Sequence, residues 1–169
     1  FVKALYQTDE QKGGFVSEPG KKNEAFQTAG QVQYVCRAGN FREKGLPYTG
    51  ALRVLKVMMG YDYLWTNIRV KGGAYGCMSG YSRNGDAYFV TYRDPHLKRS
   101  IEVFEKTSAY LRSYDADERT ITQFIIGAIG DLDTPKTPSA KGTYALSAYL
   151  SALSLENIQK SGKKLLSFS

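Results

Sequence analysis

A β-hairpin is the sequence feature that most constrains the fold. Residues 74–94 read AYGCMSGYSRNGDAYFVTYRD, with two tyrosine-rich runs on either side of Asn84-Gly85. Both turn residues tolerate the positive φ angles of a tight type I′ turn. A turn of that type predicts these cross-strand neighbours: Tyr81 with Tyr88, Cys77 with Tyr92, and Tyr75 with Asp94 near the far end. An antiparallel sheet is therefore expected.

A long helix is expected directly before the hairpin. Apolar side chains recur near helical spacing over residues 48–69, which is typical of a helix with one buried face. Gly60 interrupts the pattern at a cost of about 1 kcal/mol relative to alanine, so we expect a bend or a close neighbouring element there. Gly72-Gly73 should end the helix, because glycine accepts the left-handed conformation of a C-terminal cap.

Further helices are expected after the hairpin. Asp94-Pro95 is typical of an N-cap followed by a first helical residue. Asp115 and Glu118 have the spacing of a capping box that opens a second helix. The remaining pattern predicts a connection over residues 131–142, a helix of small residues over 143–153, and another helix capped by Ser154.

One strand is expected before the first helix. Residues 31–39, QVQYVCRAG, show the period-2 alternation of a strand, with Val32, Tyr34 and Cys36 against Gln31, Gln33 and Val35. The order of strand, helix, hairpin and three helices has no βαβ alternation. It predicts an α+β fold, an antiparallel sheet with helices packed on one face. Residues 1–30 are expected to form an extended lead-in that could join the sheet, and residues 31–169 a single domain.

Composition and charge argue against several functional classes. The 169 residues are 42% hydrophobic, which suits a folded core, and no apolar run approaches the roughly 20 residues of a membrane span. The net charge is +7, but the basic residues are scattered and no nucleic-acid-binding motif accompanies them. We therefore expect neither a nucleic acid nor a membrane as partner. Cys36 and Cys77 are expected to be buried reduced thiols, which favours a reducing compartment.

Common catalytic motifs do not fit this chain. Gly80 and Gly85 have the separation of a phosphate-binding loop, but Asp86 stands where lysine is required. His96 is the single histidine, and no nucleophile-elbow motif is present to pair with it. Zinc catalysis normally takes three protein ligands, commonly two of them histidines. The chain is therefore not expected to bind a metal by itself.

Two hydrogen-bond donors close to a glycine turn remain as candidates for chemistry. In NIRVKGGAYGC, residues 67–77, Arg69 offers a permanently charged planar fork and Tyr75 a hydroxyl that can donate to a developing oxyanion. The pair could hold a peptide carbonyl. The same residues also suit a purely structural reading, because an arginine complements the end of a helix and a tyrosine suits a strand. Residue types alone favour the structural reading.

Three stretches resemble a known enzyme family. LWTNIRVKGGAYGCMSGYSRNG, with YTGALRVLKVMMGYDYL before it and YRDPHLKRSIEVFEKTSAYL after it, resembles the C-terminal part of pitrilysin/insulinase-type zinc metallopeptidases. The presequence protease and falcilysin-like branch looks most similar, because the R-x-x-x-GAYG pattern is specific to it. The resemblance runs from about Gln31 to Leu155 and so covers most of the chain.

That resemblance implies a large enzyme of four similar α+β domains, whose two halves close around an unfolded peptide. In the family, the zinc ion, its water and the general base come from an inverted His-x-x-Glu-His motif in the N-terminal half, and this sequence lacks that motif. The C-terminal half contributes an arginine and a tyrosine that match Arg69 and Tyr75, the expected catalytic residues. By this carry-over, Tyr75 stabilises the oxyanion and Arg69 grips the substrate backbone or orients Tyr75. Gly72, Gly73 and Ala74 complete the expected substrate-binding set with Arg69.

The chain is thus expected to be a C-terminal domain fragment of a zinc metalloendopeptidase, which suits its start at Phe1 rather than methionine. Its expected partners are the N-terminal half of the same peptidase and an unfolded peptide, and the fragment alone should be inactive. Zinc would belong to the full-length parent. A bacterial-type parent would be cytoplasmic, with an organellar location left open. Two alternatives remain: a domain of a non-catalytic structural relative, and a basic module that binds nucleic acid or another polyanion.

Overall fold

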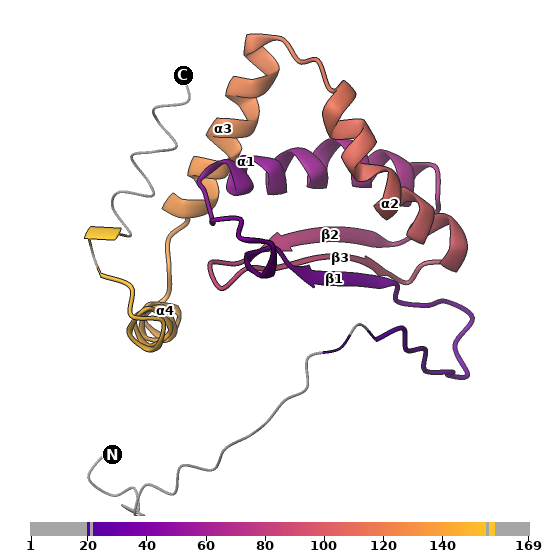
Figure 1. Ribbon diagram of the computed structural model, residues 1–169, viewed down its shortest axis with the longest axis horizontal. Helices are drawn as coiled ribbons and strands as arrows, with labels where there is room; N and C mark the ends of the chain where they lie inside the picture. The colour runs from indigo at the N-terminus through magenta and orange to yellow at the C-terminus, as the bar shows by residue number, and fades with distance from the viewer. Residues whose placement is uncertain (1–19, 21, 155, 158–169) are drawn as a thin grey trace, which may run out of the picture.

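The fold is a three-stranded antiparallel sheet with helices on one face (Figure 1). The computed structural model describes residues 20, 22–154 and 156–157. Strands β1 (Cys36–Asn40), β2 (Gly76–Tyr81) and β3 (Asp86–Tyr92) lie in the order β1-β3-β2, so β3 is central. Helices α1 (Ala51–Met58), α2 (Leu97–Ser113) and α3 (Glu118–Asp133) lie above the sheet in Figure 1, while α4 (Pro138–Leu150) lies beside its end. The predicted α+β layer is confirmed.

The hairpin closes with a three-residue loop, which corrects the predicted two-residue turn. Ser82 N–H donates to Asp86 O over 2.8 Å, and Gly85 N–H donates back to Ser82 O over 3.1 Å. Gly85 has a positive φ of 102°, whereas Asn84 does not, so the type I′ geometry is absent. Because the loop has one more residue than predicted, each residue of β2 pairs with the residue of β3 one position earlier in the chain than predicted. The observed pairs include Tyr81 with Ala87, Gly80 with Tyr88, Cys77 with Thr91 and Gly76 with Tyr92.

The strand predicted over residues 31–39 forms only in its second half. β1 begins at Cys36, and before it Gln33 makes an isolated bridge to Asp94. Val35 is the buried residue of this segment, and the more apolar set that alternates with it, which includes Val32 and Tyr34, is exposed. The alternation is therefore real, but its apolar side points away from the helices. Residues 20 and 22–32 contain no helix or strand, and the rest of the predicted lead-in lies outside the described residues.

A long helix runs along β2 above the sheet and changes its winding halfway (Figure 1). α1 (Ala51–Met58) continues without a break into two π-helical segments, η3 (Met59–Tyr63) and η4 (Trp65–Val70). The interruption predicted at Gly60 is this change, because the backbone bonds lengthen to i→i−5 there, as in Leu64 N–H to Met59 O. No heavy atom lies within 4 Å of a Cβ built on Gly60. The other explanation that the sequence offered, a neighbouring element packed closely against Gly60, is therefore wrong.

Two helices begin later than predicted, each by about two residues. α2 (Leu97–Ser113) begins after His96, and not at Pro95, because the extended chain at Asp94 still pairs with Gln33. α3 (Glu118–Asp133) is capped by Asp117, whose Oδ1 accepts from Thr120 N–H over 2.7 Å. Asp115 lies too early for the predicted capping box.

The last helix begins earlier than predicted. α4 spans Pro138–Leu150, and Thr137 Oγ1 accepts from Ala140 N–H over 3.3 Å. Proline at the first helical position and a threonine cap are a typical helix start. Only residues 134–137 connect α3 with α4. Ser154 Oγ accepts from Asn157 N–H over 3.2 Å, as expected of a cap.

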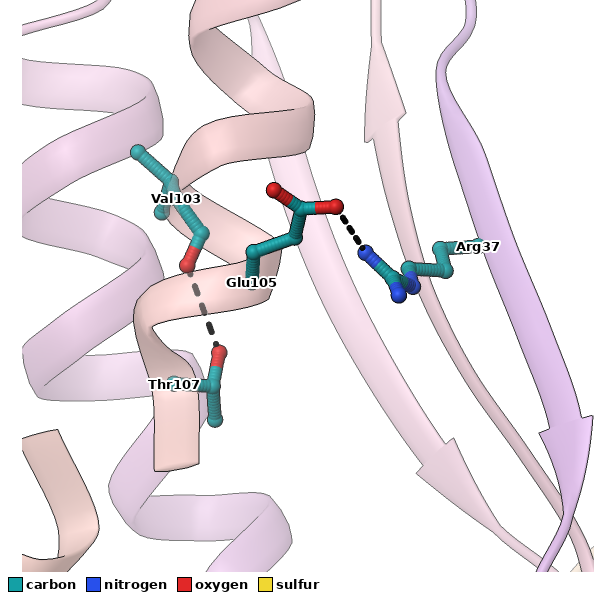
Figure 2. A network of polar contacts seen from close by, with 4 residues as sticks. All are labelled: Arg37, Val103, Glu105 and Thr107. Atoms are coloured by element: carbon teal, nitrogen blue, oxygen red, sulfur yellow. Dashed lines mark hydrogen bonds and ion pairs between the residues drawn. The ribbon is translucent and has the colours of Figure 1, made fainter. Parts of the chain in front are cut away.

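The hydrophobic core lies between the sheet and the helices. Its buried residues are Val35, Met59, Tyr63, Leu64, Ile68, Ala74 and Phe104. At the edge of this layer, Arg37 of β1 forms a 2.8 Å ion pair with Glu105 of α2, and Thr107 Oγ1 donates to Val103 O within α2 (Figure 2). The helices thus cover one sheet face only. Within the described residues, no helix is long and apolar enough to cross a membrane.

Candidate functional site

The predicted glycine turn ends η4 and starts the hairpin. Gly73 has a left-handed φ of 77°, and its N–H donates to Arg69 O over 2.9 Å. Ala74 N–H donates to Ile68 O over 3.2 Å, so both residues satisfy carbonyls at the helix end. A Cβ on Gly72 would lie 2.3 Å from Ile68 O, which no side chain tolerates. The turn therefore needs glycine at both positions, for different reasons.

This turn fixes the backbone of Tyr75 on both sides. Its N–H is shared between Tyr92 O at 3.1 Å and Arg93 O at 3.3 Å. Its carbonyl oxygen accepts a hydrogen bond from the Arg69 guanidinium. The side chain, in contrast, is 63% exposed. The backbone of Tyr75 is thus held by hydrogen bonds at both its N–H and its carbonyl, while its side chain is accessible to solvent.

The Arg69 side chain is held between two rings. Its guanidinium carbon lies 4.5 Å from the centroid of the Trp65 ring and 5.6 Å from that of Tyr75. These distances are within the range of cation–π contacts. Because Arg69 also bonds the Tyr75 carbonyl, its position is tied to that of Tyr75.

A second set of residues completes the site from the end of β3. The Tyr92 ring makes edge contacts with Tyr75 at 5.5 Å and with Tyr34 at 5.2 Å between centroids. The Arg93 guanidinium carbon lies 6.0 Å from the Tyr75 centroid and 5.7 Å from the Tyr92 centroid. We call Trp65, Arg69, Tyr75, Tyr92 and Arg93 the tyrosine–arginine cluster.

The predicted residues differ in exposure: Tyr75 and Gly73 are exposed, Arg69 is half-buried, and Gly72 and Ala74 are buried. Arg69 and Tyr75 are brought together as expected, and Gly73 is exposed in the turn between them. Gly72 is buried, and Ala74 is 4% exposed with its methyl group in the core. The substrate-binding role of this set stays a prediction. For Gly72 and Ala74, the positions suit shaping of the turn more than side-chain contact with a ligand.

Sequence reasoning did not assign Trp65, Tyr92 or Arg93 to the site. Trp65 had a usable signal, because residues four apart on a helix are neighbours and Arg69 follows at that spacing. Tyr92 and Arg93 were displaced by the register error, which placed Asp94 beside Tyr75. The positive φ of 48° at Arg93 has no sequence signal, because such angles are uncommon outside glycine.

The layer beneath the cluster is electrostatically linked to it. Burial raises the pKa of the Cys77 thiol from its usual 9.0 to about 11, with Arg69 opposing the rise and Asp94 adding to it. The thiol therefore stays protonated at neutral pH and is not a nucleophile. The Asp94 carboxylate is 1% exposed and accepts from His96 N–H at 2.8 Å and Ser100 Oγ at 2.5 Å.

The residues of the cluster do not fit a zinc ion. Arginine is not a metal ligand because it keeps its proton, and the cluster offers no histidine or carboxylate. Throughout the described part of the chain, no three side chains of His, Cys, Asp or Glu gather in a way that could hold a metal. A hollow of about 540 Å³, lined by residues that include Arg42, Ser82 and Ser147, lies at the opposite end of β2 from the cluster.

An α+β layer with an anchored arginine–tyrosine pair is the arrangement that the sequence resemblance implies for a C-terminal peptidase domain. The family model of the PreP C-terminal domain matches residues 23–169 of this chain. This chain therefore belongs to the PreP C-terminal domain family, as predicted from the sequence.

Individual relatives support the same assignment. Protein HypA of Clostridium perfringens is 44% identical over 158 residues, which cover 94% of this chain and 16% of that protein. Presequence protease 1, chloroplastic/mitochondrial, of Arabidopsis thaliana is 35% identical over 161 residues, 93% of this chain and 15% of its own length. The mitochondrial presequence protease of Schizosaccharomyces pombe is 34% identical over 130 residues, 74% and 13% respectively. The chain thus spans about a sixth or less of these relatives.

Proposed function

We propose that this chain acts as one domain of a peptidase that hydrolyses unfolded peptides, and that Tyr75 donates a hydrogen bond to the oxyanion formed at the scissile carbonyl. The observation that carries this proposal is the contrast at Tyr75 between an anchored backbone and a 63% exposed side chain. The Tyr75 ring also contacts Tyr92 and lies near the guanidinium groups of Arg69 and Arg93, and these contacts restrict its orientation before substrate arrives. Preorganised donors of this kind stabilise developing charge at little reorganisation cost.

Arg69 is a positioning residue in this proposal. Its guanidinium already bonds the Tyr75 carbonyl and stacks on Trp65, so these contacts are made without substrate. Of the two roles expected from the sequence, orientation of Tyr75 has the direct structural support. The positive charge near the Tyr75 ring would also favour negative charge on a bound carbonyl oxygen.

The rest of the reaction must come from outside the described chain. Zinc would supply the nucleophilic water in the parent enzyme that the family resemblance implies, and the cluster has no ligands for it. We therefore propose that the N-terminal half of the same peptidase is the partner that holds the metal and the general base. The residues of this chain bind and orient the peptide and stabilise the oxyanion.

Replacement of Tyr75 by phenylalanine in the full-length protein tests the catalytic role. The change removes the hydroxyl and keeps the ring contacts with Tyr92, so kcat should fall by about 10²-fold or more with little change in KM. Steady-state cleavage of a fluorogenic peptide measures both constants. Tyr61→Phe is the matched control, because Tyr61 is 79% exposed on η3, outside the cluster. An unchanged kcat for Tyr75→Phe would sink the role.

The isolated chain tests the proposed division of labour. Alone, it should neither cleave peptides nor retain zinc, whereas its addition to a separately prepared N-terminal half should restore cleavage. The measurements are peptide hydrolysis and the metal content of each half after gel filtration. Cleavage by the isolated chain would contradict the proposal.

For location, we propose the cytoplasm of a bacterial-type cell. Cys36 and Cys77 are free thiols on opposite faces of the sheet, as suits a reducing compartment, although Cys36 is exposed and Cys77 only half-buried, which corrects the expectation that both are buried. The plant and yeast relatives carry organellar names. Fractionation of the source cells decides between the two compartments.

A further inference from the structure

Arg93 is the residue of the cluster with the most unusual backbone. Its φ is 48°, in the left-handed region that is unfavourable for residues other than glycine. The conformation has a local consequence, because the carbonyls of Arg93 and Tyr92 share the Tyr75 N–H. A residue held in this way at a candidate site is a reason to ask what its side chain does.

The side chain of Arg93 has rings beside it but no counter-charge from the part of the chain that the structure describes. Its guanidinium lies against Tyr75 and Tyr92, and within the described residues it makes no hydrogen bond and no ion pair. The neighbouring carboxylate, Asp94, is buried and already accepts from His96 N–H and Ser100 Oγ. Five N–H donors in a planar fork are therefore available at the surface.

The second arginine of the cluster differs in this respect. Arg69 is committed to the Tyr75 carbonyl and to Trp65. It contributes charge but has less freedom to bind a ligand. Two guanidinium groups thus lie within 6.0 Å of the Tyr75 ring centroid, one occupied and one with its donors unused. The chemical group that matches an unused guanidinium fork best is a carboxylate, which accepts two parallel bonds.

We propose that Arg93 binds a carboxylate of the peptide held against Tyr75, and so makes the peptidase prefer substrates with an acidic group near the cleaved bond. The inference rests on the proposed function, because it requires peptide beside Tyr75. The carboxylate comes either from an Asp or Glu side chain or from the C-terminus of a short peptide. A solvated arginine that only stacks on tyrosine is the competing interpretation, and it predicts no charge preference.

Peptide pairs in the full-length protein separate these interpretations. One series carries Glu or Gln at a single position that is moved along the peptide around the cleaved bond. A second series ends in a free carboxylate or an amide at varied distance from that bond. In at least one pair, kcat/KM should be about tenfold higher for the charged member, as for a charge-assisted pair worth about 1.4 kcal/mol. The series that shows the preference identifies the source of the carboxylate.

The decisive variant is Arg93→Asn, because asparagine tolerates the left-handed conformation and has no charge. It should reduce the tenfold preference to about one, while Arg93→Lys should keep part of it through charge without the fork. Arg93→Gly, which also suits the backbone, replaces Arg93→Asn if that variant unfolds. Arg99→Gln is the matched control, since Arg99 is exposed in the first turn of α2 and is not one of the residues that make the ring contacts of the cluster. It should keep the wild-type preference.

Two results would overturn the inference: no charge preference in the wild-type protein, or a preference that survives in Arg93→Asn and Arg93→Gly. Failure of the proposed function is recognised separately, because it leaves kcat unchanged in Tyr75→Phe. Fluorescence anisotropy with the same labelled peptides and the Tyr75→Phe protein measures the charge preference as a ratio of Kd values. That ratio reports on Arg93 whatever the role of the Tyr75 hydroxyl.

Discussion

The two faces of the sheet are similar in composition but opposite in surroundings. On the covered face, Thr91 of β3 is fully buried beneath the helices, where Leu64 and Met59 are also 0% exposed. On the open face, Met78 and Tyr88 are 52% and 41% exposed, although both are large and apolar. Apolar character alone therefore does not identify the core of this domain. The core is instead identified by the face of the sheet against which the helices pack.

The tyrosine–arginine cluster lies at the border between these faces. Arg69 comes from the helix that covers one face, while Tyr92 alternates with buried Thr91 and so belongs to the other. The buried side provides a rigid support, and the open side provides access to solvent. If this division is correct, mutations on the covered face should change stability and those in the cluster should change activity.

The largest expected effect is the loss of stability when the covered face is damaged. Leu64→Ala removes a fully buried side chain, so the free energy of unfolding should fall by about 3–5 kcal/mol. Met78→Ala, the matched change on the open face, should cost less than about 1 kcal/mol, because the side chain already contacts water. Urea unfolding of the 169-residue chain measures both. Equal losses would mean that the open face is buried in solution, for example by self-association.

Much of the fold follows from local sequence signals. The hairpin, the long helix and its glycine end were predictable because each depends on neighbouring residues such as Gly72 and Gly73. The register was not, since a two-residue and a three-residue loop at Asn84-Gly85 differ only in backbone angles. Likewise, Asp115 and Asp117 are both plausible caps, and the choice depends on where the chain leaves α2.

The one-residue error in the predicted β2–β3 register also changes which residue is expected beside Tyr75. Arg69 and Tyr75 were predictable as a pair because one local turn joins them. The residue beside Tyr75 on β3 was not, because it depends on strand pairing. The predicted neighbour, Asp94, is acidic and buried, whereas the observed neighbour, Arg93, is basic and exposed. A shift of one residue thus reverses the sign of the charge expected beside the candidate catalytic tyrosine.

The smallest expected effect concerns the two cysteines, which lie on opposite faces. Cys36 is exposed on the open side, and Cys77 is packed against the core with its pKa raised to about 11 by burial. At pH 7.5 a thiol with that pKa has about a hundredfold less thiolate than an ordinary one, partly offset by its greater nucleophilicity. Cys77 should therefore react with iodoacetamide at least about tenfold more slowly than Cys36. Mass spectrometry of the labelled peptides measures each rate.

The pH dependence separates charge from access as the cause of slow labelling. A folded-state pKa raised by burial means that the Cys77 rate should keep increasing with pH until about pH 11. Simple steric blockage would instead keep the rate low at every pH at which the fold persists. Cys36→Ser should remove the fast phase and leave the slow one unchanged. The same labelling in the full-length protein then tests the open face directly, because slow reaction of Cys36 there, with fast reaction in the isolated chain, would show that another part of the parent covers it.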